Sequence, residues 1–265
     1  MQKEFFSELE ILLYENNQTR KFHHFQNFYE DFKCQKLIFN HNHISIFKKN
    51  IAQNITLEHP TRIRRPKLAN STHALAKIIH SIAHIEFSAI NLALDASYRF
   101  KNLPLQFYQD WLEVADEEIK HFKLLNLALE ELGYKYGDFP AHDNLEAALE
   151  ATKDSLNFRM GIVHRGLEAK GLDANPYVVK KFQSSNHPIK NLLIEYFNII
   201  LNDEIKHVKK GDIWWNFANK NKYDFIQLCT LFKQFSLAGK KINIQARMKA
   251  GFKKEECEIL EKFYS

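Results

Sequence analysis

Hydrophobic positions recur three or four residues apart along four long stretches of the chain, which is the spacing of a buried helix face. The stretches cover residues 71–100, 104–133 and 143–170, and the fourth begins at Pro188. Ser or Thr stands where the first should begin, Pro opens the second and fourth, and Gly follows the second and third. The pattern predicts four long helices, with the third ending at Gly171 and a connector before the fourth.

The segments on either side of these helices have a different pattern. Residues 1–68 predict one or two short helices and a hairpin near residues 36–47, followed by a basic linker punctuated by proline. Residues 221–265 contain two amphipathic pieces rich in Lys and Phe. We therefore expect an all-α protein: a leader over 1–68, a four-helix bundle over 69–220, and a helical extension over 221–265 that packs on the bundle.

Composition supports long helices in a globular chain. Of 265 residues, 45% are hydrophobic and 26% are charged, and only 8 are Gly and 6 Pro. The net charge of +5 permits an anionic partner without requiring one. Three widely spaced cysteines form no metal or disulfide pattern, and neither a secretory signal nor a membrane span is expected. These features predict a cytoplasmic protein.

Two nearly identical motifs place acids within the apolar stripes. The second predicted helix contains "EEIKH", and the fourth contains "DEIKH". In each motif the second acid precedes the histidine by three residues, giving Glu118-x-x-His121 and Glu204-x-x-His207. Residues three apart lie on one helix face, so each pair can converge on one point. Because a buried carboxylate is costly unless it is protonated, paired or metal-bound, these motifs indicate a metal site.

The other two helices each supply one further acid. Glu86 lies in the apolar stripe of the first, and Glu168 lies in "HRGLEAKGLDANP" near the expected end of the third. One Glu from each of two helices and a Glu-x-x-His from each of the other two is the ligand set of dimetal carboxylate bundles. The sequence predicts a site for two divalent metal ions, with iron the expected metal and manganese or a mixed pair the alternative. The predicted ligands are Glu86, Glu118, His121, Glu168, Glu204 and His207.

Three further residues are predicted to support these ligands. Asp203 and Glu117 each precede a ligand Glu and could accept the second ring N–H of a ligand histidine. His164 lies one turn before Glu168 on the same face, as a supporting residue, a proton carrier or an extra ligand. The alternative is a solvated acid for the first two and a hydrogen-bonded core histidine for the third.

These stretches resemble the ferritin-like superfamily and, more closely, the bacterial domain-of-unknown-function family 455. The resemblance covers about residues 70–220. It is carried by "HSIAHIEFSAINLALDA", "FYQDWLEVADEEIKHFKLLNLALEELGYKYGDFPAHD", "HRGLEAKGLDANP" and "DEIKHVKKGDIWW". It implies a ferritin-like four-helix bundle with the six ligands named above, and it implies no particular reaction.

Three functions are compatible with such a site. The first is an O2-activating oxidoreductase, a monooxygenase or oxidase, with Glu118 and Glu204 as the carboxylates expected to act in catalysis. The second is iron or peroxide handling of the ferritin or rubrerythrin type. The third is a non-catalytic metal-binding protein.

The expected partners follow from charge and size. A small molecule or an RNA is the candidate substrate, since basic residues in the linker and the tail could hold an anion. The segments at both ends favour a monomer or small homo-oligomer over a ferritin cage. The basic residues in question are Arg62, Arg64, Arg65, Lys233, Lys240, Lys241, Arg247, Lys249, Lys253 and Lys254.

Overall fold

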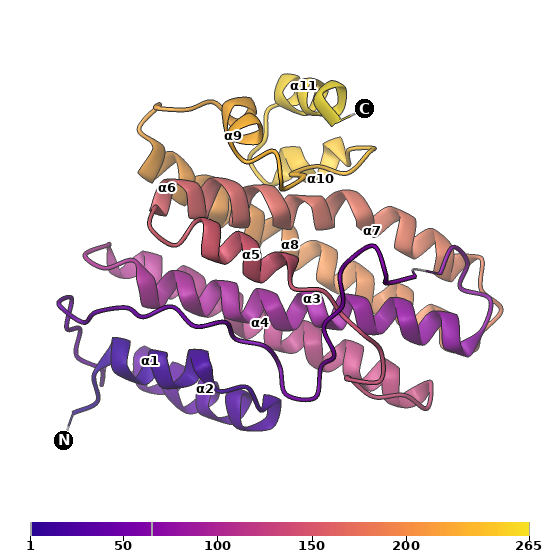
Figure 1. Ribbon diagram of the computed structural model, residues 1–265, viewed down its shortest axis with the longest axis horizontal. Helices are drawn as coiled ribbons and strands as arrows, with labels where there is room; N and C mark the ends of the chain where they lie inside the picture. The colour runs from indigo at the N-terminus through magenta and orange to yellow at the C-terminus, as the bar shows by residue number, and fades with distance from the viewer. Residues whose placement is uncertain (1, 65, 265) are drawn as a thin grey trace. The chain divides into compact units, whose positions relative to one another are not determined.

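The computed structural model describes residues 2–64 and 66–264, and it is all-α (Figure 1). Over these residues the β-structure consists of the isolated bridges Glu4↔Ile38 and Leu57↔Ala141, so the expected hairpin near residues 36–47 is wrong. Arg65 lies outside the described residues. The helices are α1 (Phe5–Tyr14), α2 (Gln18–Lys33), α3 (Thr72–Arg99), α4 (Leu105–Glu131), α5 (Asn144–Ala151), α6 (Leu156–Phe158), the π-helix η1 (Arg159–Leu167), α7 (Glu168–Gln183), α8 (Lys190–Asn219), α9 (Phe225–Leu231), α10 (Ile244–Lys249) and α11 (Lys254–Tyr264).

Three of the four predicted long helices form where the hydrophobic pattern placed them. They are α3, α4 and α8. Ser71 accepts the backbone N–H of Ala74 at 3.2 Å, so it caps the start of α3 as its position predicted. Gly133 follows α4 with φ +76°, a conformation that favours glycine at a helix end.

The third predicted helix differs from the expectation. It is broken at residues 152–155, and the chain continues through α6, η1 and α7 to Gln183 instead of ending at Gly171. Pro176 lies inside α7 and cannot donate to the carbonyl of Leu172, four residues before it. The side chain of Asn243, in the C-terminal extension, donates to that carbonyl at 3.2 Å. A distant segment thus supplies the hydrogen bond that the proline removes.

The described chain divides into two compact units. The first comprises residues 2–64, 80–126 and 134–146, and the second comprises residues 66–79, 127–133 and 147–264. The three-part division predicted from the sequence is a different partition and stays a prediction.

In the first unit, helices α1 and α2 lie side by side (Figure 1). Their buried residues are largely aromatic, with Phe5 and Phe6 in α1 and Phe22, Phe25 and Phe28 in α2. Phe22 contacts Phe122 of α4 with ring centroids 5.4 Å apart. Lys21 is fully buried, and its ammonium donates to the carbonyl of Leu13 and to Asn91 Oδ1, both at 2.8 Å. The predicted leader is therefore part of the core around α3 and α4 in this unit.

In the second unit, α8 contacts both η1 and α7 (Figure 1). The C-terminal extension forms α9, α10 and α11, where the sequence predicted two pieces. It is anchored by Arg247, whose guanidinium donates to both carboxylate oxygens of Asp173 at 2.9 and 2.7 Å. Arg247 and Asp173 are 0% and 2% exposed, so this is a buried ion pair.

Candidate metal centre

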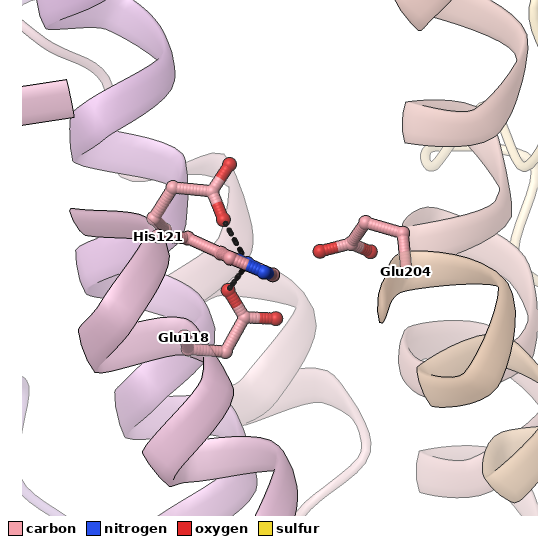
Figure 2. A group of neighbouring side chains, drawn as sticks. Glu118, His121 and Glu204 are labelled. Atoms are coloured by element: carbon pink, nitrogen blue, oxygen red, sulfur yellow. Dashed lines mark ion pairs between the residues drawn. The ribbon is translucent and has the colours of Figure 1, made fainter. Parts of the chain in front are cut away.

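Two neighbouring long helices bring two acids and a histidine together in the first unit. Glu86 comes from α3, and Glu118 and His121 come from one face of α4. The three residues are 4%, 0% and 0% exposed. His121 Nδ1 lies 3.4 Å from Glu86 Oε2 and 3.4 Å from Glu118 Oε2 (Figure 2 labels His121 and Glu118). The apolar stripes that form the core also carry these three side chains inward.

Burial and repulsion from a neighbouring carboxylate raise the pKa of Glu86. The pKa of Glu86 is raised to about 8, first because the carboxyl is buried and then because Glu118 is close. Contact with His121 opposes the rise. Without a cation, the site therefore favours a protonated Glu86 at neutral pH.

Glu204 of α8 completes a group of four. One ligand atom from each of Glu86, Glu118, His121 and Glu204 lies within 4.8 Å of the others, and the group could hold a metal ion (Figure 2). Figure 2 labels three members of this group, Glu118, His121 and Glu204. Four of the six predicted ligands thus belong to one potential metal-binding group.

The remaining two predicted ligands belong to the second unit. His207 is fully buried, and its Nδ1 lies 3.6 Å from Glu204 Oε1. Glu168, at the start of α7, lies with its Oε1 2.8 Å from Nδ1 of the fully buried His164. Burial, with Arg159 and His207 nearby, holds the pKa of His164 well below its usual value. Glu168 and His207 stay predicted ligands.

The predicted supporting residues have different surroundings. His164 contacts Glu168, as described. Asp203 is buried, and its Oδ1 accepts from the exposed Lys206 at 2.8 Å. Glu117 is half-buried on α4. The roles of all three as support for the ligand histidines remain predictions.

Close backbone packing sets the spacing of α8 and η1, which the sequence did not reveal. A Cβ built on Gly211 would lie 2.6 Å from the carbonyl carbon of His164 and 2.9 Å from the nitrogen of Arg165. Arg165 in turn donates to Asp212 at 2.6 Å and to Glu256 of α11 at 2.8 Å. The position of a glycine in the sequence does not identify the backbone that packs against it.

One basic residue predicted to hold an anionic partner is unavailable. Arg247 is fully buried in its ion pair with Asp173, so its inclusion in the basic surface was wrong. The planar guanidinium of arginine can donate to both oxygens of one carboxylate, which suits it to a buried ion pair. The six lysines of the tail set, Lys233, Lys240, Lys241, Lys249, Lys253 and Lys254, are exposed, as are Arg62 and Arg64.

The helices and this group define an all-α protein with buried acids and a histidine that could bind a metal ion. The chain belongs to the family described as "Protein of unknown function (DUF455)", whose model matches residues 14–258. It is also 42% identical, over 207 residues, to an uncharacterized protein of Haemophilus influenzae, covering 73% of this chain and 70% of the relative. No solved structure matches. Among the described residues, no helix is long and apolar enough to cross a membrane.

Proposed function

We propose that this chain is a dinuclear metal-carboxylate oxidoreductase that uses iron and O2, with a ferritin-like arrangement of its long helices. One metal position takes ligands from the group of Glu86, Glu118, His121 and Glu204. The other takes Glu168 and His207, and Glu204 and Glu118 each have a second carboxylate oxygen to offer it. The observation that carries the proposal is the convergence of three carboxylates and an imidazole within 4.8 Å.

The charge of this group supports the presence of a cation. Glu118 is fully buried and Glu86 nearly so, and uncompensated buried carboxylates cost several kcal/mol. The raised pKa of Glu86 expresses that cost in the metal-free chain. A divalent ion would allow both acids to ionise, since its charge offsets theirs.

The donor types narrow the choice of metal. Carboxylate oxygens with imidazole nitrogens suit iron, manganese and zinc, whereas Ca²⁺ prefers six to eight oxygen ligands and Cu(I) prefers sulfur. Contacts of 3.4, 3.4 and 3.6 Å between histidine and carboxylate atoms also fit two ligands of one ion. Ligand atoms about 2.0–2.2 Å from an ion lie roughly 3–3.6 Å from each other.

Two ferrous ions held by these residues would supply two electrons to O2 as they become ferric. The chain's own contribution is ligand geometry and a dry environment, because Glu118, His121 and His207 are fully buried. Glu118 and Glu204 are the proposed catalytic carboxylates, since each can serve either metal position. A small organic molecule is the proposed substrate class.

Metal content is the first test of this function. We expect about two iron ions per chain after anaerobic loading, measured by elemental analysis of the full-length protein. Glu118→Gln should lose most of this iron, whereas Glu195→Gln, on an exposed part of α8, should retain it. Circular dichroism establishes that both variants are folded. Iron content independent of Glu118 would contradict the site.

Oxygen consumption is the second test. The reduced, iron-loaded protein should consume O2 in a single turnover faster than the Glu118→Gln protein treated identically. Turnover of peroxide without O2 consumption would indicate peroxide handling instead. Tight binding of zinc alone, with no redox response, would indicate a structural metal site. A mass of many subunits in size-exclusion chromatography would indicate storage.

A further inference from the structure

Near the proposed metal positions, the contact of His164 with Glu168 is shorter than three other contacts between a histidine and a carboxylate. His121 Nδ1 lies 3.4 Å from both Glu86 and Glu118, and His207 Nδ1 lies 3.6 Å from Glu204. These separations exceed the usual 2.7–3.2 Å of an N–H···O hydrogen bond. The contact between His164 and Glu168 lies within this range.

His164 Nδ1 lies 2.8 Å from Glu168 Oε1. The side chain of His164 is 0% exposed and that of Glu168 is 8% exposed, so the contact is sheltered from water. Glu168 is also outside the group whose ligand atoms lie within 4.8 Å of one another. In this structure the Glu168 carboxylate therefore contacts a histidine of the preceding π-helix, η1.

The backbone around His164 is closely packed, whereas the side chain of Glu168 can change rotamer without a backbone movement. Gly211 of α8 lies against the carbonyl carbon of His164, where a Cβ would be 2.6 Å away. The next residue, Arg165, is fixed by Asp212 and by stacking on Phe252, with the guanidinium 3.9 Å from the ring centroid. Glu168 stands at the end of the π-helix, with its backbone N–H bonded to the carbonyl of Val163. Rotation of its flexible side chain is the easier movement.

We propose that the two metal positions fill in a fixed order and that the hydrogen bond between His164 and Glu168 sets this order. The first ion binds at Glu86, Glu118, His121 and Glu204, whose atoms are already gathered. The second position becomes available only when Glu168 exchanges its contact with His164 for a metal. This inference rests on the proposed dinuclear function and adds a regulatory residue, His164, which positions Glu168.

The size of the effect follows from the strength of a charge-assisted hydrogen bond. Losing one such bond would weaken the second binding step by about 10- to 100-fold relative to a site without it. His164→Leu removes the ring nitrogens and retains an apolar side chain in a buried position. The second step should then tighten by about that factor, while the first step stays within about twofold of the wild-type protein.

Anaerobic titration of the full-length chain with Mn²⁺, followed by electron paramagnetic resonance, tests the order directly. At one equivalent we expect the six-line signal of isolated Mn²⁺ to dominate, and a spin-coupled signal to grow only toward two equivalents. His187→Leu, in the loop before α8, is the matched histidine control and should titrate like the wild-type protein. The titration of the wild-type protein tests the order of filling by itself. This test therefore remains valid even if His164→Leu does not fold.

The outcomes separate this inference from the function on which it rests. A coupled signal that appears from the first addition, with no accumulation of isolated Mn²⁺, would overturn ordered filling and leave the dinuclear site intact. Weaker binding of the second Mn²⁺ ion in His164→Leu would overturn the inhibitory role of the hydrogen bond. It would show instead that His164 supports a ligand or is itself a ligand. Saturation at one ion in the wild-type protein would refute the dinuclear function and this inference with it.

Discussion

Gly211 of α8 meets the backbone of His164 so closely that a Cβ at position 211 would lie 2.7 Å from the carbonyl oxygen of His164. The contact joins the helix that carries Glu204 and His207 to the segment that carries Glu168. The spacing of these helices thus depends on the absence of one methyl group.

Gly211→Ala should therefore destabilise the protein and disturb metal binding. Overpacking against backbone costs about 1–3 kcal/mol, because neither helix can yield by rotating a side chain. We expect a lower midpoint of urea unfolding and a lower content of bound metal. Gly171→Ala is the control, since nothing lies within 4 Å of a Cβ there. It should stabilise α7 by about 0.5–1 kcal/mol. Equal effects of the two substitutions would contradict the close contact.

Glu86→Gln should have opposite effects on the metal-free and metal-loaded protein. Without metal, the substitution removes a buried acid whose pKa is raised to about 8 by burial and by Glu118, so the unfolding temperature should rise. With metal, a ligand charge is lost, so the stabilisation gained on adding Mn²⁺ should fall. Differential scanning calorimetry with and without Mn²⁺ measures both. If Mn²⁺ stabilised Glu86→Gln as much as the wild-type protein, Glu86 would not be a metal ligand.

Acid should destabilise the first unit through His80. Its ring Nε2 accepts the backbone N–H of Gly137 at 2.9 Å, an arrangement that requires the neutral ring. Burial lowers the pKa of His80 to about 4. The unfolded state, with a pKa near 6.5, binds more protons between these values, so stability is full above pH 6.5 and falls as the pH drops toward 4. The loss is up to about 3 kcal/mol.

His80→Gln isolates this contribution, because the glutamine amide oxygen can accept the same N–H and does not titrate. We expect a flatter dependence of unfolding free energy on pH between 6.5 and 4 in the variant, measured by urea denaturation. The same slope in both proteins would show that other groups cause the acid sensitivity.

The ion pair of Arg247 and Asp173 should hold the C-terminal extension on α7. Arg247→Ala leaves a buried carboxylate without its cation, at a cost of about 3–5 kcal/mol. Asp173 also accepts from the backbone of Gly239 and Asn243, so the loop containing them should loosen and be cleaved faster by trypsin. Lys254→Ala removes an exposed pair with Glu258 and should change stability by less than about 1 kcal/mol. Comparable losses in the two variants would contradict the anchoring role.

The sequence alone determined the helices whose signals are local and unopposed. The stripes of α3, α4 and α8 repeat over many turns, and Ser71 and Gly133 mark two of their ends. The same stripes identified the buried acids, because a carboxylate in an apolar face stands out without any knowledge of its neighbours. Four of the six ligands named in this way lie together in the structure.

Only the tertiary structure decided the conformation of the segment between α4 and α8, because contacts with distant residues outweigh its local helix-ending signals. Gly171 and Pro176 are signals that end helices, yet α7 continues past both, since Asn243 donates to the carbonyl that Pro176 leaves without its helical partner. The π-helix contains His164, which contacts Glu168 and whose backbone packs against Gly211 of α8, a partner that no local pattern names. Periodicity records which face of a helix is apolar, but it contains no information about the atoms that another segment brings to that face.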